Sequence, residues 1–192
     1  MRLNGFFLCR VLTLAFLIFG PISIFSERLH GANMQLVESN KATVPSWISL
    51  EREKIYWLEE RLEFVYSRQG LSALALGIKQ TQLNTFHSFT RALSLTVFSE
   101  LLEQGISLSE VQQKKLKQLL VSKVDKISYP NFKIADIYYR KWKSLEPGKA
   151  DSIDVYCLAY LSFEEWQRLK NSLGVELKKH KNRKIRELWK NL

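Results

Sequence analysis

Apolar residues recur every three or four positions in several stretches of the chain, which is the spacing of a helix with one buried face. Residues 51–66 fit this period and predict an amphipathic helix that ends near Gly70. Residues 84–104 predict a second helix, buried on most sides, with an apolar stripe that begins at Phe86 and ends before Gly105.

Two more helices are predicted by capping boxes, in which a serine stands three residues before a glutamate. Ser107 precedes Glu110 and opens a helix that runs through Val124. Ser162 precedes Glu165 in the same way, and the helix that follows continues at least to Gly174, which ends or weakens it. Both boundaries therefore follow from the need of a helix N-terminus for hydrogen-bond acceptors.

Between these helices the hydrophobic period changes from helical spacing to two, the period of a strand. Residues 132–142 and 152–161 alternate in this way and are rich in aromatic and β-branched side chains. Tyr129-Pro130 breaks the chain before the first of them, and Pro147-Gly148 predicts a turn between them, so the two segments should form a hairpin. Residues 71–78 form a short apolar run that suits a buried strand, although periodicity alone does not exclude a helix.

The resulting order of elements predicts the α+β class, with a small, mainly antiparallel sheet and helices packed on one of its faces. A length of 192 residues accommodates one domain of ordinary size plus appended segments. We place that domain at residues 47–177, after a tether at residues 27–46, and treat residues 178–192 as a separate basic tail.

The N-terminal segment has the pattern of an export signal. Arg2 and Arg10 precede residues 11–25, which contain no charged side chain, and such a stretch partitions from water into lipid. We therefore expect residues 1–26 to be a signal peptide or an uncleaved signal anchor, and the alternative is a helix buried in the core. No small-x-small cleavage pattern precedes Ser26 or Ala32, so cleavage stays open. Cys9 comes before the apolar run and not after it, which does not fit a lipoprotein acylation site.

The net charge of +10 lies mostly at the two ends of the chain. Residues 1–26 carry +2, residues 178–192 carry +6, and the long middle segment carries only +2. In the tail, Ile185, Leu188, Trp189 and Leu192 have the spacing of an amphipathic helix. Its basic residues are Lys178, Lys179, Lys181, Arg183, Lys184, Arg186 and Lys190.

The basic tail is a candidate site for anionic lipid or an acidic partner protein. Nucleic acid would also be attracted by the charge, but export argues against it. A solvated tail without a partner is the other interpretation, and in either case we expect the fold to survive removal of residues 178–192.

Four aromatic residues of the expected hairpin are candidates for an interaction surface, because Tyr and Trp bury much area with few rotatable bonds. They are Tyr138, Trp142, Tyr156 and Tyr160. The alternative is that these side chains belong to the core.

The sequence offers little that suggests catalysis. Two cysteines and three histidines, far apart along the chain, supply no spaced zinc site or disulfide framework, and we expect no cofactor. Asp136 and Asp154 are the best carboxylate candidates, but exposure to solvent, or pairing with Arg140 or a neighbouring lysine, explains them better than acid-base chemistry. His87 has no nearby ligand partner, and Cys157 is expected to be a buried, inert thiol.

Residues 132–173 resemble the end of a domain found in small bacterial envelope lipoproteins and in the N-terminal region of flagellar assembly protein T. That family has a strand of the form v-D-x-Y, a variable loop, a Y-x-V-x-v-L-v strand and a helix that begins near an acidic pair. Its pattern is matched by Asp136, Tyr138, Tyr139, Val155, Tyr156 and Leu158. Trp47, the apolar run at 71–77 and the long helix bearing Ala92 extend the likeness over residues 47–173.

The resemblance implies a non-enzymatic component of the bacterial envelope, associated with outer-membrane or flagellar assemblies. Together with the N-terminal segment, it predicts an exported protein located in the periplasm or anchored in the inner membrane, with an envelope or flagellar protein as partner. Two other classes stay open: a cytosolic module that binds nucleic acid through residues 178–190, and a hydrolase.

Overall fold

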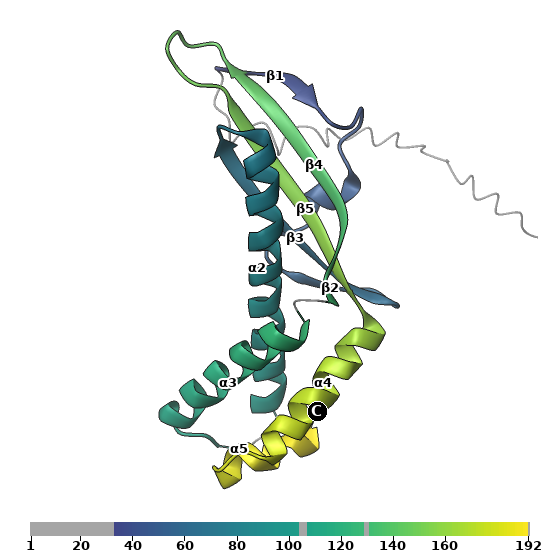
Figure 1. Cartoon of the computed structure of the whole chain (residues 1–192), viewed down its shortest axis with the longest axis vertical. Helices are drawn as coiled ribbons and strands as arrows, with labels where there is room; N and C mark the ends of the chain where they lie inside the picture. Colours follow the sequence, from purple (N-terminus) through teal and green to yellow (C-terminus); the bar gives the residue numbers. More distant parts are fainter. Residues whose placement is uncertain (1–32, 104–106, 129–130, 192) are drawn as a thin grey trace, which may run out of the picture. The chain divides into compact units, whose positions relative to one another are not determined.

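A five-stranded antiparallel sheet organises the described part of the chain (Figure 1). The computed structural model describes residues 33–103, 107–128 and 131–191, and its folded unit begins at Met34. The strands are β1 (Met34–Ser39), β2 (Ile55–Trp57), β3 (Arg61–Leu71), β4 (Lys133–Ser144) and β5 (Ser152–Ser162), in the order β1-β4-β5-β3-β2. The predicted α+β class is confirmed.

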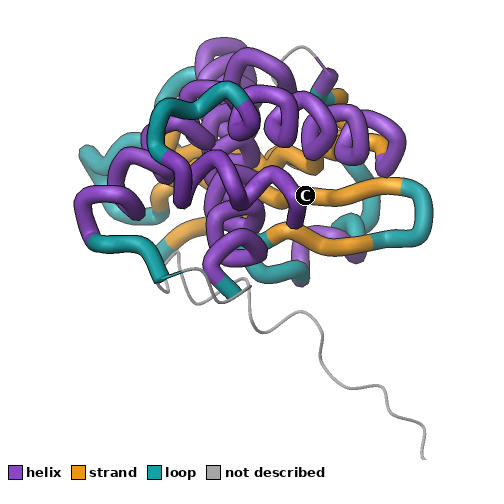
Figure 2. Tube along the Cα trace, turned by 90° about the horizontal axis from the view of Figure 1, so that it is seen from below, coloured by secondary structure: helices purple, strands orange, loops and turns teal. Residues whose placement is uncertain are grey.

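Helices pack against one face of this sheet (Figure 2). The long α2 (Leu74–Leu102) crosses β3 and β5, α3 (Glu110–Ser128) packs on α2, and α4 (Phe163–Lys178) follows β5 directly. The chain ends in a short α5 (Arg183–Glu187) and the 3-10 turn η3 (Leu188–Asn191), which both contact α4. A further 3-10 turn, η1 (Ser46–Ser49), belongs to the segment before β2.

The predicted hairpin of β4 and β5 is confirmed. Tyr138 pairs with Tyr156, and Arg140 pairs with Asp154, along an antiparallel register. Gly148 occupies the connection with φ +80°, a backbone conformation that glycine adopts without strain. The alternation of period two therefore predicted these two paired strands correctly.

The helix expected at residues 51–66 is wrong, because this segment forms β2 and β3. Leu58 donates its amide hydrogen to the Arg61 carbonyl at 2.9 Å, so Glu59 and Glu60 form a tight turn and not the outer face of a helix. Residues 62–65 are all buried, since β3 is covered on both faces of the sheet. Leu62, Phe64 and Tyr66 alternate with polar residues as in a strand, but Val65 interrupts the alternation, and with it the apolar positions also matched the helical period.

The strand expected at residues 71–78 is also wrong, because α2 begins at Leu74. The chain turns at Gly70, with φ +69°, and the Gly77 amide donates to the Ala73 carbonyl in the first helical turn. A Cβ atom on Gly77 would lie 2.8 Å from a methyl of Leu71, so glycine lets the helix pass close to the end of β3. This apolar run packs as the start of a helix.

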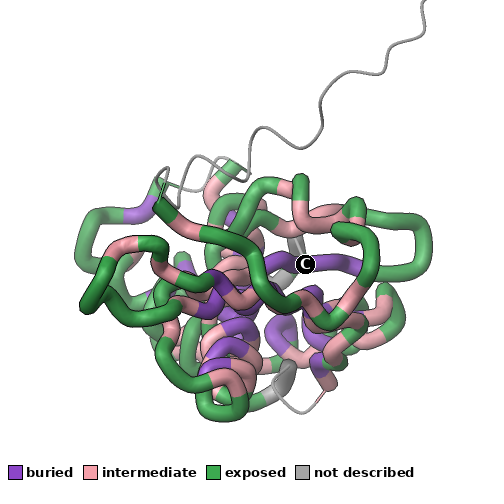
Figure 3. The backbone as a smooth tube through the Cα atoms, turned by 90° about the horizontal axis from the view of Figure 1, so that it is seen from above, coloured by how far each residue is buried: buried purple, intermediate pink, exposed green. Residues whose placement is uncertain are grey.

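The main core lies between the sheet and the helices (Figure 3). Phe89 stacks on Phe64 of β3 at 5.0 Å and on Phe132 at 4.5 Å between ring centroids. Further along the apolar stripe that the sequence predicts for α2, Leu93, Val97 and Leu101 are all fully buried. The buried apolar face of the helix predicted at residues 84–104 is thus confirmed. Its predicted end at Gly105 lies outside the described residues.

One of the two predicted capping boxes is displaced. The Ser162 hydroxyl accepts a hydrogen bond from the Glu165 amide at 3.3 Å and caps α4 as expected, and Gly174 lies buried inside that helix without ending it. At α3 the cap is Ser109 and not Ser107: the Ser109 amide donates to the Gln112 side chain at 2.9 Å. Gln serves as well as Glu in such a box, and the register shifts by two residues.

The second face of the sheet is covered by residues 40–54, which include the end of the expected tether and the start of the expected helix at 51–66. Part of the expected tether is strand β1, paired with β4. Arg52 lies over the ring of Tyr156 at 5.6 Å, and the Glu53 amide donates to the Val65 carbonyl. The expected signal at residues 1–26, with Cys9, lies outside the described residues.

Candidate binding surface

The predicted basic tail is a docked element of the fold. Ile185 and Leu188 are fully buried and belong to the main core cluster. Asn182 caps α5 by accepting hydrogen bonds from the amides of Lys184 and Ile185 at 3.0 and 3.3 Å. The two apolar residues therefore fix which way the basic side chains of α5 point, whereas the side chain of Trp189 and the whole of Leu192 are outside the described residues.

All seven basic residues of the tail are exposed. Lys179 pairs with Glu176 and Lys190 pairs with Glu187, and a hydrogen bond from Lys190 lowers the pKa of Glu187. Lys184 donates to the carbonyl of Ser107 at 3.0 Å, which joins α5 to the residues before α3. Part of the basic charge is therefore compensated or engaged within the fold.

Three tail residues make no ion pair with a described residue: Lys181, Arg183 and Arg186. Lys114 and Lys115 on the first turns of α3 add two exposed cations at the same end of the folded unit (Figure 1). We call the exposed basic residues of 178–190 the basic helical surface.

The aromatic residues of the hairpin are mostly core. Tyr138, Trp142 and Tyr156 are buried, with 1%, 6% and 1% of their surface exposed. Tyr160 is half-buried, and the Arg61 guanidinium lies over its ring at 5.2 Å. The interpretation of these four residues as an exposed interaction surface is therefore wrong for the first three, because residues 40–54 cover this face of the sheet.

Asp154 and Arg140 form a buried polar cluster on the covered face. Asp154 is fully buried and accepts a hydrogen bond from the Trp142 indole at 2.9 Å. Its carboxylate lies 3.7 Å from the Arg140 guanidinium, which also donates to the Tyr156 hydroxyl at 2.7 Å and contacts the Trp142 ring. The expected pairing of Asp154 with Arg140 is confirmed, and the cluster holds two neighbouring strands together.

Asp136 fastens the N-terminal segment to β4. It pairs with Lys41 and accepts a hydrogen bond from the Trp47 indole at 2.9 Å. Burial raises the pKa of Asp136, but the hydrogen bonds from Lys41, Trp47 and the Ile137 amide outweigh burial and lower it overall. This carboxylate therefore stays charged and occupied by structural contacts, as the expected pairing with a lysine implies.

The remaining candidates are Cys157 on β5 and His87 on α2. Burial raises the pKa of the Cys157 thiol to about 11, so the thiol is protonated at neutral pH, as expected for a buried residue. His87 is exposed on α2, at the edge of a groove between α2 and α3. Among the described residues there is no group of His, Cys, Asp and Glu that could hold a metal ion. None of the helices in the described residues is long and apolar enough to cross a bilayer.

Comparison with known proteins gives no relative: no protein family, curated protein or solved structure matches this chain. A functional assignment must therefore rest on the residues and their arrangement. The strongest feature is the basic helical surface, whose residues are also evident in the charge pattern of the sequence. Ile185 and Leu188, which fix the orientation of this surface, form the apolar side of the amphipathic pattern in the sequence. The pattern alone did not show which part of the protein they contact.

Proposed function

We propose that this chain is an exported, non-enzymatic protein of the bacterial cell envelope. In this proposal, residues 1–26 direct it to the inner membrane and periplasm. Its α+β domain serves binding or assembly, with an envelope or flagellar protein as partner. The basic helical surface attracts the anionic headgroups of the membrane.

The observation that supports the binding step is the fixed orientation of α5. Because Ile185 and Leu188 are buried in the core, this helix cannot insert its apolar face into lipid. Attraction to a membrane would be electrostatic, at roughly 1 kcal/mol for each Lys or Arg near an anionic surface. The three cations without an ion pair, Lys181, Arg183 and Arg186, would then contribute roughly 3 kcal/mol, or about a hundredfold in affinity.

The vesicle experiment compares the full chain with a variant that carries Lys181→Gln, Arg183→Gln and Arg186→Gln. Co-sedimentation is measured with vesicles containing one third anionic lipid and with neutral vesicles, because binding to neutral vesicles reports any contribution of the apolar N-terminal segment. The triple variant should bind anionic vesicles about a hundredfold more weakly and neutral vesicles equally. The difference should shrink as salt rises from about 50 to about 300 mM, since screening shortens the reach of exposed charges.

A matched control removes the same amount of charge elsewhere. Lys133, Lys143 and Lys149 are exposed on the β4–β5 hairpin, and replacing all three with Gln leaves the basic helical surface intact. This variant should bind anionic vesicles within about threefold of the unmodified chain. Equal weakening by both triple variants would show that only net charge matters and would contradict a localised surface.

Compartment is tested by fractionating cells that express the full chain with a C-terminal tag. Recovery with the inner membrane or the periplasm supports the proposal. Recovery of the intact chain in the cytosol, together with salt-sensitive binding of duplex DNA, would instead favour the nucleic-acid module.

A further inference from the structure

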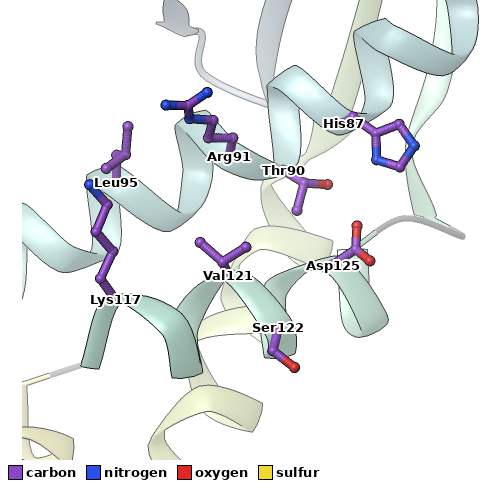
Figure 4. A pocket seen from close by; sticks show the side chains of 8 residues that line it. All are labelled: His87, Thr90, Arg91, Leu95, Lys117, Val121, Ser122 and Asp125. Carbon is purple, nitrogen blue, oxygen red and sulfur yellow. The ribbon is translucent and has the colours of Figure 1, made fainter. Parts of the chain in front are cut away.

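Exposed apolar side chains point to a particular partner only where the charges around them favour one. In the groove between α2 and α3, Leu95 and Val121 lie among Arg91, Lys117 and Asp125 (Figure 4). Charges of both signs line this groove, so charge selects no partner for it. A second apolar feature lies at the end of the β2–β3 hairpin, and there the exposed charges that lack an ion pair are negative.

Three large apolar side chains are exposed where the β2–β3 hairpin meets the first turn of α4 (Figure 1). Trp57 is 49% exposed, Leu58 47% and Phe163 42%. The Phe163 amide donates to the Glu60 carbonyl at 2.8 Å, which holds α4 against the tip of the hairpin. The Trp57 ring packs on Trp166 at 5.5 Å between centroids, and Phe163 stands three residues before Trp166 on α4, so these side chains adjoin one another. Such an exposed apolar patch is a common mark of an interaction surface.

Two carboxylates border the apolar side chains. Glu59 and Glu60 form the tip of the hairpin, between β2 and β3. Both are exposed, and neither makes an ion pair with a described residue. Arg61, which follows the tip, pairs with Glu63 instead. We call the following residues the acidic aromatic patch: Trp57, Leu58, Glu59, Glu60 and Phe163.

The chemistry of this patch favours a partner that presents arginine. Its carboxylates repel anionic headgroups, whereas a guanidinium group both pairs with a carboxylate and stacks on an aromatic ring. This chain presents such groups on α5. Arg183 and Arg186 stand three residues apart, on the side of α5 away from the buried Ile185, and neither makes an ion pair with a described residue. The basic helical surface is therefore complementary to the acidic aromatic patch.

The two surfaces cannot meet within one chain. The patch lies at the first turn of α4 and α5 follows its last turn, and a helix of 16 residues spans about 24 Å (Figure 1). This distance is much longer than an arginine side chain. A second copy can place its α5 on the patch of the first, and its own patch then stays open for a third. A contact between two different surfaces continues in this way into a ring or a filament.

We propose that copies of this chain associate head to tail, with α5 of one copy on the acidic aromatic patch of the next. Arg183 and Arg186 pair with Glu59 and Glu60, and one guanidinium group stacks on the exposed ring of Trp57. Each copy carries a net charge of +10, so the association is weak and depends on these local contacts. The inference goes beyond the proposed membrane role and is tested without lipid.

Sedimentation velocity of the full chain measures this association at rising protein concentration. A salt concentration of about 100 mM limits the reach of the net charges to about 10 Å, while ion pairs in direct contact persist. The average mass should rise with concentration and should not level off at a dimer, because the contact leaves one surface open at each end. A mass that stays that of one chain up to about 1 mM protein, or that levels off at a dimer, would overturn the proposal.

Charge reversal identifies the two surfaces that meet. One variant carries Glu59→Lys and Glu60→Lys, and the other carries Arg183→Glu and Arg186→Glu, all at exposed positions. Each variant brings like charges into contact and should associate with itself about a hundredfold more weakly than the unmodified chain. Mixing the two variants brings opposite charges together again, so the mixture should associate. A mixture that stays monomeric, or a variant that associates like the unmodified chain, would refute the contact.

Two further variants separate local contacts from net charge. Lys143→Glu with Lys149→Glu changes net charge as much as the α5 variant does, at exposed positions of the β4–β5 hairpin, and should associate within about threefold of the unmodified chain. Equal weakening by this control and by the α5 variant would show that net charge alone governs assembly. Trp57→Leu stays apolar and removes the indole, and it should weaken association by about two- to fivefold; an unchanged affinity would refute the stacking on Trp57.

Discussion

The docking of α5 can be tested by shortening one buried side chain. Ile185 is fully buried, and Ile185→Ala removes three carbon atoms from the core cluster. At about 0.8 kcal/mol for each buried methylene, the lost transfer free energy is about 2.4 kcal/mol, and the cavity left behind adds to it. We therefore expect the free energy of unfolding to fall by about 2 to 5 kcal/mol. The smaller change Ile185→Val should cost about 0.5 to 1.5 kcal/mol.

Urea denaturation followed by tryptophan fluorescence measures these differences, and Trp166, fully buried on the neighbouring α4, supplies a core signal. A thermal melt gives a second readout: for a chain of this size, a loss of 3 kcal/mol lowers Tm by about 6 to 12 °C. Val175→Ala is the control, because this α4 side chain is 48% exposed. It should change stability by less than about 0.5 kcal/mol.

The reasoning is refuted if Ile185→Ala unfolds at the same urea concentration as the unmodified chain. In that case α5 would contribute nothing to the core, and residues 178–192 would behave as the separate tail expected from the sequence. The buried positions lead instead to the expectation that deletion of residues 178–192 destabilises the whole unit.

Three further predictions concern the hairpin. Arg140→Met removes the partner of the buried Asp154 and should lower the free energy of unfolding by about 3 to 5 kcal/mol in urea titrations at pH 7; a loss below 1 kcal/mol would contradict the pairing. Asp136→Asn should cost about 1 kcal/mol at pH 7, and the cost should decrease as pH falls below the ordinary carboxyl pKa of about 3.9, because a carboxylate with a lowered pKa loses its stabilising effect as pH falls through the folded value; a cost that stays the same in urea titrations down to about pH 2 would argue against it. In a Cys9→Ser chain, Cys157 should resist a thiol reagent at pH 8 until urea is added, since a pKa of about 11 leaves only about one thiolate in a thousand; rapid modification of the native chain would show that this thiol is accessible.

Local sequence signals were reliable where one physical cause dominated. The alternation in residues 132–161 identified β4 and β5 because hydrogen-bonded strands place successive side chains on opposite faces. The cap at Ser162 was predicted for an equally local reason, since a helix N-terminus needs acceptors for its free amides. The charge pattern located the basic helical surface without any knowledge of the fold.

The errors arose where a segment contacts elements distant in the sequence. Residues 62–65 are buried on both faces of the sheet, and the apolar Val65 on the face of Glu63 interrupts an alternation that Leu62 and Phe64 begin. Residues 71–78 failed for a different reason, since the segment is too short for periodicity to separate a strand from a helix. The groove between α2 and α3 was not predicted, because its residues lie on two helices and come together only when α3 packs on α2.

By itself, the sequence determined the α+β class, the central hairpin, the buried stripe of α2 and the concentration of positive charge at the C-terminal end. These properties depend on local spacing and composition, which remain the same in any fold. The tertiary structure decided which face each element presents. It buried the aromatic side chains of the hairpin under residues 40–54 and docked Ile185 and Leu188 into the core, which leaves the basic residues outside. The hydrophobic effect is non-directional, so an apolar residue in the sequence does not specify what it packs against. Only the complete set of packed elements determines which apolar side chains are buried and which charges are exposed to a partner.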